Sequence, residues 1–409
     1  MGRSSCLSHL VAVLLLALSR RSFSRFRLVP LPSTLAHTRF ARSYNAYYVN
    51  ERMLIPAISL DTAQKILRVG RGINFLRACA PLAANQPDVD MSLTVSLLSN
   101  PLTLNKIVDR YNDSLDKRIV SSMFDDYDLL EHLKALKKFL LLGQGDFVSA
   151  LLDAVGPELS KAAENVYRHN LTGVLDTALR GTNAQYLPQD ILDRVGVKLY
   201  EPSPHDAGWD IFSLDYHVDT PLTAVIHARA SARYRRIFHL LWRLKRIEWS
   251  LNITWRRAVS VNHALSRGRG KQDNVTFSQA LRRVALLRQE MLHVTSNFQN
   301  YLMFEVLEGS WNEMEKRLKG AKTLEEVIEA HDDYLNSILK LALLGDDPES
   351  KLLYSQLGAI LDQADRFCGV QVSHEHAPTH MCAQSRAPHL FTHCVCFGSH
   401  ALCSRIGCS

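Results

Sequence analysis

Hydrophobic residues recur at intervals of three and four positions through most of the segment from Ser59 to Phe367. This spacing gathers apolar side chains on one side of an α-helix, whereas a half-buried β-strand would show strict alternation. Glycine and proline residues, such as Gly156 with Pro157, interrupt the periodic stretches and mark turns. The pattern predicts an all-α protein with helices at 59–79, 103–124, 128–142, 145–155, 158–181, 221–257, 275–308, 311–319, 324–344 and 348–367.

Four segments depart from the helical pattern. Val197–Tyr200 and Asp210–Asp215 are the plausible strands, which allows at most one small β-hairpin. Residues 80–100 are rich in proline and polar residues and are predicted to form a loop between domains. Residues 259–274 are polar and contain glycine, so we expect a mobile surface loop there.

The predicted helix at 221–257 is the longest. Pro221 is placed in its first turn, where a missing amide donor costs nothing, and Asp219 or Thr220 is the expected cap. Its large apolar residues step by three or four and are predicted to pack as one stripe: Tyr234, Ile237, Leu241, Leu244, Ile247, Leu251 and Trp255. Its cations are expected to keep their head groups in water or to meet a partner. They form two rows along other sides of the helix, one of Arg229, Arg236 and Arg243 and one of Arg235, Arg246 and Arg257.

Charge is unevenly distributed along the chain. Residues 1–50 contain seven Arg and no acidic residue, so the remaining 359 residues carry 41 basic and 41 acidic side chains. A uniformly basic nucleic-acid binder is therefore disfavoured. Between Arg229 and Arg257, however, nine Arg or Lys accompany one acid, Glu248. Such local segregation favours an acidic protein partner, although many charge runs are only solvated faces.

The first 43 residues differ from the rest of the chain. A basic start, an apolar run at 10–18 and further arginines are compatible with a signal peptide or an organellar transit peptide. The apolar run is too short to span a bilayer. We favour a third interpretation, a mispredicted start that translates non-homologous sequence.

The last 42 residues, 368–409, contain six Cys and six His. Their spacings, such as Cys394-x-Cys396 and His374-x-His376, lack the paired C-x2-C and H-x3-H half sites of zinc domains. We therefore predict no metal site and a tail of non-homologous sequence. Cysteine is otherwise nearly absent, which fits a reducing compartment. The sequons at Asn112, Asn170, Asn252 and Asn274 would matter only in a secreted chain.

Two short motifs contain polar residues of the kinds found in binding or catalytic sites. The turn Gly143-Gln144-Gly145-Asp146-Phe147 fails the phosphate-loop patterns, because Val148 occupies a required glycine position and no Lys-Ser or Lys-Thr pair follows. We interpret it as a helix-to-helix turn in which glycine permits positive backbone angles and Asp146 caps the next helix.

The second motif, Asp215, Tyr216, His217 and Asp219, brings together groups that suit acid and base catalysis, but helix capping explains it more simply. No nucleophile elbow, metalloprotease motif or spaced Cys and His pair occurs elsewhere. The single His residues in helices, and the aromatics Phe298, Tyr301, Phe304 and Trp311, are expected to serve core or interface packing. We therefore predict no enzyme activity and no cofactor.

Four blocks in order resemble the gamma-tubulin complex component family. They are HLKALKKFLLLGQGDF (132–147), YRHNLTGVLDTALRGTNAQY (167–186), WDIFSLDYHVDTPLTAVIHARASARYRRIFHLLWRLKRIEWSLNITW (209–255) and NYLMFEVLEGSW (300–311). The resemblance covers roughly residues 44–367. It implies elongated helical bundles, with residues 44–100 as the end of an amino-terminal helical domain and its linker, and 101–367 as a carboxy-terminal gamma-tubulin-binding domain.

What the resemblance implies is templating of microtubules. Expected partners are gamma-tubulin, other components of its complex and, indirectly, alpha/beta-tubulin and microtubule minus ends, with no nucleic acid and no membrane span. The expected location is the cytoplasm and cytoskeleton, at the microtubule-organising centre or spindle pole. Candidate gamma-tubulin contacts are Gln144, Gly145, Asp146, Phe147, Asp215, Tyr216, Asp219, Arg236, Arg243, Lys245 and Arg246.

Two alternatives stay open. One is a helical scaffold or adaptor without tubulin contact. The other is an organellar or secreted helical enzyme, suggested by the arginine-rich head alone.

Overall fold

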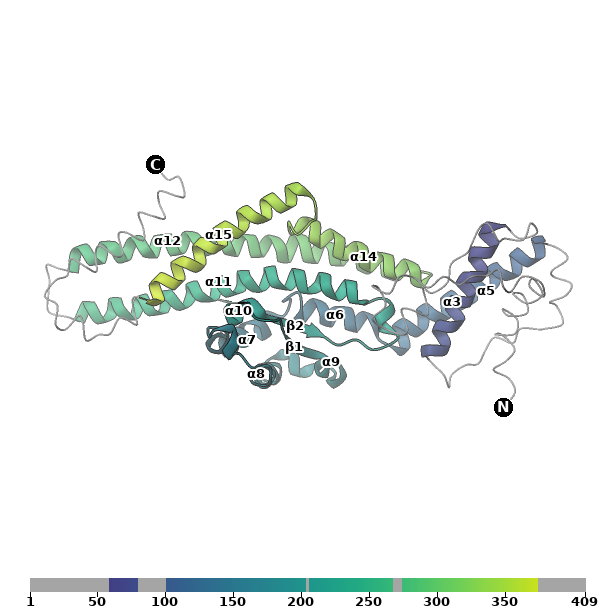
Figure 1. Ribbon diagram of the computed structural model, residues 1–409, viewed down its shortest axis with the longest axis horizontal. Coiled ribbons are helices and arrows are strands. Elements are labelled where there is room, and N and C mark those ends of the chain that lie inside the picture. Colours follow the sequence, from purple (N-terminus) through teal and green to yellow (C-terminus); the bar gives the residue numbers. More distant parts are fainter. Residues whose placement is uncertain (1–58, 80–100, 204–205, 268–273, 374–409) are drawn as a thin grey trace. The chain divides into compact units, whose positions relative to one another are not determined.

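The computed structural model describes residues 59–79, 101–203, 206–267 and 274–373 (Figure 1). Most of them are helical, and the described strands form one two-stranded sheet, so the all-α prediction with at most one small hairpin is confirmed. The predicted head (1–43), the loop at 80–100 and nearly all of the predicted tail lie outside the described residues. Contacts divide the chain into two compact units, which are taken in turn.

The first unit contains the described residues up to 134, residues 217–232 and residues 314–333. Its helices include α3 (Leu60–Cys79) and α5 (Pro101–Ser121), which continues into a π-helical segment at Ser122–Asp126. Ser59 caps the start of α3, since the Thr62 amide donates to Ser59 Oγ at 3.2 Å. Gly72 lets α3 approach α5 closely, because a Cβ there would lie 2.5 Å from Leu115 Cδ2.

Asp116 lies on α5 with only 7% of its surface exposed. Burial, reinforced by the negative charge of Glu325 and opposed by Arg68, raises the pKa of its carboxyl to about 6. From about pH 4 to 6 the folded chain keeps a proton that the unfolded chain has released, so the free energy of unfolding falls as pH rises through this window.

We therefore expect Asp116→Asn to raise the free energy of unfolding at pH 7 by about 1 to 3 kcal/mol, with the gain disappearing below about pH 4. Urea unfolding, monitored by circular dichroism at pH 7 and below about pH 4, measures this change in the free energy of unfolding. Asp176→Asn, an exposed change on another helix, is the control and should stay within about 0.5 kcal/mol at both. A loss of stability in Asp116→Asn at pH 7 would contradict the burial argument.

The second unit contains residues 135–216, 233–313 and the described residues from 334 onward. A hairpin of β1 (Val195–Leu199) and β2 (Phe212–Tyr216) pairs antiparallel with Val195 opposite Tyr216 and Val197 opposite Leu214, as predicted in outline. Around the hairpin and along the long helix lie the other elements: α7 (Gly145–Leu159), α8 (Arg168–Arg180), α9 (Gln189–Asp193), α10 (Gly208–Ile211), α12 (Asn274–Asn300), the π-helical η8 (Tyr301–Glu308) and α15 (Pro348–Ser373).

Four helices have residues in both units. They are α6 (Leu129–Phe139), α11 (Ala228–Arg267), α13 (Gly309–Gly320) and α14 (Leu324–Leu341). Among the described helices, none is both long enough and apolar enough to cross a membrane.

An aromatic cluster forms the core beside the hairpin. The ring centroid of Trp242 lies 5.0 Å from that of Phe212, 5.6 Å from that of Phe238 and 5.9 Å from that of Trp209. Trp249 extends the cluster, with its ring 5.6 Å from that of Trp209. Because α11 supplies three of these rings and β2 one, the cluster joins the long helix to the sheet.

Several predicted boundaries were wrong. Gly156 and Pro157 do not end a helix, because both lie inside α7. The steric conflict that proline usually causes involves the Cβ of the residue before it, and Gly156 has none. The same glycine is pressed against α11, where its Cβ would lie 2.5 Å from the ring of Trp249.

The start of the long helix was also misplaced. Pro221 precedes a 3₁₀ turn (η7, Leu222–Ala224), and α11 begins only at Ala228. Val225 and Ile226 are buried between them, and His227 Nδ1 bonds the Val225 carbonyl, so the chain turns before it becomes helical. The predicted helix at 158–181 likewise starts late, at Arg168.

Two predicted interruptions are wrong in the described residues. Of the loop expected at 259–274, residues 259–267 and Asn274 are helical, and the remaining residues, 268–273, lie outside the described part of the chain. No loop separates η8 from α13, since Gly309 has helical φ of −58° and ψ of −52°. Positive φ expected at the Gly143 turn is found at Leu142 (54°) instead. Gly143 is required for close approach, because a Cβ there would lie 2.9 Å from the Lys137 carbonyl oxygen.

Candidate protein-docking surface

The apolar stripe of α11 packs largely as predicted. Tyr234, Ile237, Leu244, Ile247 and Leu251 are each at most 1% exposed, and Leu241 is buried as well. Trp255 is the exception, with 49% of its surface exposed, because the helix has by then passed beyond the dense core. The stripe therefore orients the remaining faces of α11, which carry the cations.

Several cations of α11 pair with acids of the same chain, contrary to the prediction that their head groups stay in water or meet a partner. Arg235 Nη1 lies 3.2 Å from Asp215 Oδ1 on β2. Arg243 Nη2 lies 2.6 Å from Asp362 Oδ1 on α15 and donates to the Gly358 carbonyl at 3.3 Å. These partners lie 20 and 119 residues away in sequence. The positive charge of these two side chains is therefore largely neutralised by acids of the same chain.

Arg246 contacts two carboxylates and an aromatic ring. Its guanidinium lies 3.5 Å from Asp210 Oδ1, 3.9 Å from Asp365 Oδ1, and 5.4 Å from the centre of the Trp209 ring. Burial raises the pKa of Asp365, and the positive charges of Arg246 and Arg243 oppose that effect. Arg246 thus holds α10, α11 and α15 together.

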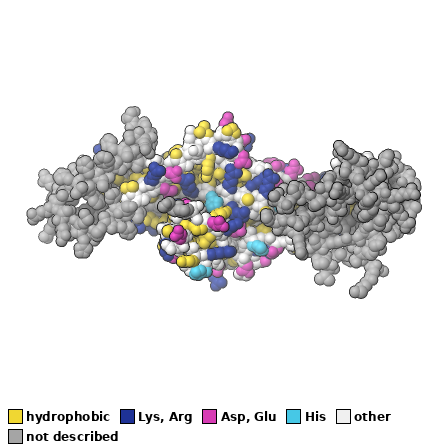
Figure 2. Space-filling model, in the orientation of Figure 1, with side chains coloured by type: hydrophobic (Ala, Val, Ile, Leu, Met, Phe, Trp, Pro, Cys, Tyr) yellow, Lys and Arg dark blue, Asp and Glu magenta, His cyan; other side chains and the backbone are white. Residues whose placement is uncertain are grey.

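Lys245 and Arg236 complete the predicted basic set. Lys245 Nζ pairs with Glu248 at 2.9 Å along the same helix. Arg236 Nη1 lies 3.3 Å from Asp346 Oδ1, and both side chains remain well exposed. Figure 2 shows Lys and Arg side chains interspersed with Asp and Glu side chains on the face that it presents. A uniformly positive field is absent from that view.

The ion pair between Arg243 and Asp362 allows a clean test of its structural role. We expect Arg243→Asp and Asp362→Arg to be destabilising singly, and the double exchange to recover most of the loss, with a coupling free energy of about 0.5 to 1 kcal/mol for this half-exposed pair. Urea unfolding of the four proteins gives the value. A coupling of zero would mean that the pair does not hold α15 against α11.

The predicted Gln144–Phe147 contacts divide into exposed and buried residues. Gln144 and Gly145 lie at the start of α7, and Asp146 is exposed in its first turn. Asp146 Oδ2 accepts a hydrogen bond from the Asn183 amide at 2.9 Å, which lowers the pKa of the carboxyl. It therefore ties α7 to the 183–186 turn rather than capping its own helix, and Phe147 is fully buried.

The Asp215–Asp219 segment has the same division. Tyr216 is buried, and burial raises the pKa of its phenol. Asp215 pairs with Arg235, whereas the exposed His217 Nε2 lies 3.1 Å from Asp219 Oδ1. The first pair joins β2 to α11, and the second lies within the segment itself. Asp215 and Asp219 remain accessible to solvent. Phe147 and Tyr216 are buried and pack beneath the surface residues.

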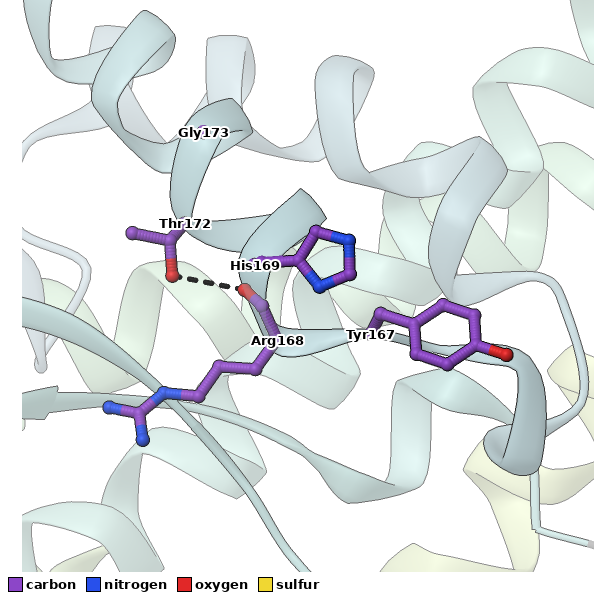
Figure 3. A pocket seen from close by; sticks show the side chains of 5 residues that line it. All are labelled: Tyr167, Arg168, His169, Thr172 and Gly173. Carbon is purple, nitrogen blue, oxygen red and sulfur yellow. Dashed lines mark hydrogen bonds between the residues drawn. The ribbon is translucent and has the colours of Figure 1, made fainter.

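An open depression lies at the start of α8, lined by Tyr167, Arg168, His169, Thr172 and Gly173 (Figure 3). Every lining residue is exposed, and the Thr172 hydroxyl donates to the Arg168 carbonyl at 3.0 Å. The Tyr167 and His169 rings lie 5.8 Å apart. Among the described residues, no three His, Cys, Asp or Glu side chains gather in a way that could hold a metal ion.

Sequence reasoning missed two further contacts that position the surface. Trp249 Nε1 donates to Asp153 Oδ1 of α7 at 2.8 Å. Lys137 Nζ lies 2.8 Å from Glu308 Oε1 and 4.8 Å from the centre of the Trp311 ring. Both pairs join residues far apart in the chain, and no local pattern indicates them.

Comparison with known proteins gives a consistent match. The family described as "Gamma tubulin complex component C-terminal" matches residues 129–393. Gamma-tubulin complex component 3 homolog of Xenopus laevis is 38% identical over 339 residues, which cover 80% of this chain and 36% of that protein. The human gamma-tubulin complex component 3 is 36% identical over 79% of this chain and 36% of its own length.

A fungal relative is similar to the same degree. The spindle pole body component alp6 of Schizosaccharomyces pombe is 37% identical over 302 residues, which cover 73% of this chain and 36% of that protein. The chain thus spans roughly a third of the length of these curated relatives.

Proposed function

Because the chain belongs to the gamma-tubulin complex component family, we propose that it is a subunit of the gamma-tubulin complex that binds gamma-tubulin. Its role is templating rather than bond chemistry. Each subunit holds one gamma-tubulin, and adjacent subunits set the spacing onto which alpha/beta-tubulin adds at the microtubule minus end. A template lowers the entropic cost of ordering the first tubulins, because that order is already present in the complex.

The main support is the extent of the match with the family's carboxy-terminal region. It begins at Leu129, the first residue of α6, and runs beyond the end of α15, so it includes the aromatic core and the whole of α11. The ion pairs of Arg235, Arg243 and Arg246 hold the surrounding elements in place. A rigid helical surface of this kind suits protein docking, which needs preorganised side chains.

We place the gamma-tubulin contacts on the accessible members of the predicted set. These are Gln144, Gly145, Asp146, Asp215, Asp219, Arg236, Arg243, Lys245 and Arg246. Arg236 is the best residue for testing these contacts by mutation, since its side chain is 45% exposed and its partner Asp346 is 87% exposed. Reversing its charge therefore alters the surface with little effect on the fold.

Co-precipitation of purified gamma-tubulin with the full chain tests the proposal. We expect capture by the wild-type chain and about fivefold or more weaker capture by Arg236→Glu. Arg180→Glu, an exposed change on α8, is the matched control and should bind normally. Absence of capture by the folded wild-type chain would favour a scaffold without tubulin contact. Capture that Arg236→Glu leaves intact would move the contact away from α11.

The proposed location is the cytoskeleton at the microtubule-organising centre or spindle pole. This follows from the proposed membership of the complex, and two relatives are named as spindle pole body components. Imaging of the tagged full chain should place it at spindle poles or in the cytosol. Accumulation in mitochondria would instead support the organellar hypothesis raised by the arginine-rich head.

A further inference from the structure

The far ends of α11 and α12 carry more positive than negative charge. We call residues 255–267 and 274–290 the arm; they are the ends of α11 and α12 at the left of Figure 1. The sequence of the arm contains six Arg and one acid, Glu290. The two helices are joined away from these ends, where Gln299 Nε2, close to the carboxyl end of α12, donates to the Leu244 carbonyl of α11 at 3.1 Å.

The arm differs from the rest of α11 in its ion pairing. Arg235, Arg243 and Arg246 each meet a carboxylate of another element. Among the described side chains, none pairs in this way with Arg256, Arg282 or Arg283, and all three are exposed. Charges that are not compensated internally are available to attract a partner over several ångströms.

Exposed apolar residues accompany these cations. Trp255 and Val259 are one helical turn apart and are 49% and 38% exposed, with Arg256 beside them. On α12, Leu286 is 59% exposed and lies one turn after Arg282 and Arg283. None of the described side chains of the arm is buried. The arm therefore offers apolar anchors that the chain's own core does not use.

We infer that the arm is a docking site for an acidic polypeptide segment that carries apolar side chains. Carboxylates of the segment pair with Arg256, Arg282 and Arg283, and its apolar residues cover Trp255 and Leu286. Tryptophan and arginine are the residue types that dominate binding at protein interfaces. This site is separate from the proposed gamma-tubulin contacts and does not depend on them.

A membrane surface is a poorer match. An interfacial helix needs a continuous apolar face opposite its basic face. On α12, Leu286 is instead surrounded by Arg282, Arg283 and Glu290 on one exposed face. Nucleic acid would use the cations but gains little from exposed Val259 and Leu286, because neither side chain stacks on a base.

The test uses the full chain and a fluorescein-labelled 20-residue helical peptide with glutamate on one face and leucine on the other. Fluorescence anisotropy gives its Kd. We expect the triple variant Arg256→Glu, Arg282→Glu, Arg283→Glu to bind at least about tenfold more weakly, and Trp255→Ala about threefold or more. The matched control Arg168→Glu, Arg180→Glu reverses exposed charges on α8 and should leave the Kd unchanged.

Three results would overturn the proposal: no binding of the peptide to the wild-type chain, equal weakening by the α8 control, or stronger association with anionic phosphatidylserine vesicles or single-stranded RNA than with the peptide. Circular dichroism confirms that each variant is folded. If the triple reversal unfolds, the corresponding Arg→Gln variant replaces it, and an unchanged Kd in that folded protein also refutes the arm as the docking site.

Discussion

Trp242→Ala is expected to lower the free energy of unfolding by about 3 to 5 kcal/mol, the usual cost of emptying a buried aromatic site. Trp242 is 2% exposed and is stacked on Phe238 at an interplanar angle of 16°. It also contacts Phe212 of β2, so its removal opens a cavity between α11 and the hairpin. Since both elements carry candidate docking residues, gamma-tubulin capture should decline together with stability.

The control for this change is on the same helix. Trp255→Ala removes an equally large side chain that is half exposed, and it should change stability by less than about 1 kcal/mol. Trp242→Phe is informative as well, because the buried Nε1 of Trp242 has no hydrogen-bond partner and phenylalanine retains much of the ring. Thermal and urea unfolding measure all three variants. Equal losses in the two Trp→Ala variants would refute the assigned core.

Phe147→Ala should cost a similar amount, about 3 to 5 kcal/mol. Its side chain is fully buried in α7, edge-on to Phe139 with ring centroids 5.1 Å apart. Phe147 is one of the predicted gamma-tubulin contacts, yet a residue without exposed surface affects a partner only through the shape of the turn above it.

Two further variants separate support from contact. Phe304→Ala removes a phenylalanine that is 68% exposed and should leave the free energy of unfolding within about 0.5 kcal/mol of wild type. Phe147→Leu keeps an apolar side chain in the core and should cost less than about 1.5 kcal/mol. If Phe147 only supports the turn, Phe147→Leu retains gamma-tubulin capture. Loss of capture in this folded variant would show that the ring itself matters.

The register of α11 could be predicted because helical periodicity is a local property. The spacing from Tyr234 to Leu251 identifies the buried face without any knowledge of what covers it. Trp255 follows the same spacing but is half exposed, because the packing partners thin out towards the arm. Periodicity states which residues share a face, and only the neighbouring elements decide how far along the helix that face is covered.

The break predicted at Gly156 and Pro157 failed for a related reason. Glycine followed by proline usually marks a turn, but here α7 gains contact with α11, and the absence of a Cβ at Gly156 makes room for Trp249. Trp249 lies 96 residues from its hydrogen-bond partner Asp153. The glycine-proline pattern that predicted the turn is local, so it contains no information about a contact between residues so far apart in the sequence.

The sequence by itself determined the helical class, the buried face of α11, the small hairpin and the excess of positive charge near residues 229–257. Helix propensity, the spacing of apolar residues and the charge of a segment all depend only on residues that are close together in the sequence. Only the tertiary structure decided that Arg235, Arg243 and Arg246 pair with distant carboxylates, while none of the described carboxylates pairs with Arg256, Arg282 or Arg283. Ion pairing acts over a few ångströms in space, and folding brings together groups more than a hundred residues apart, such as Arg243 and Asp362.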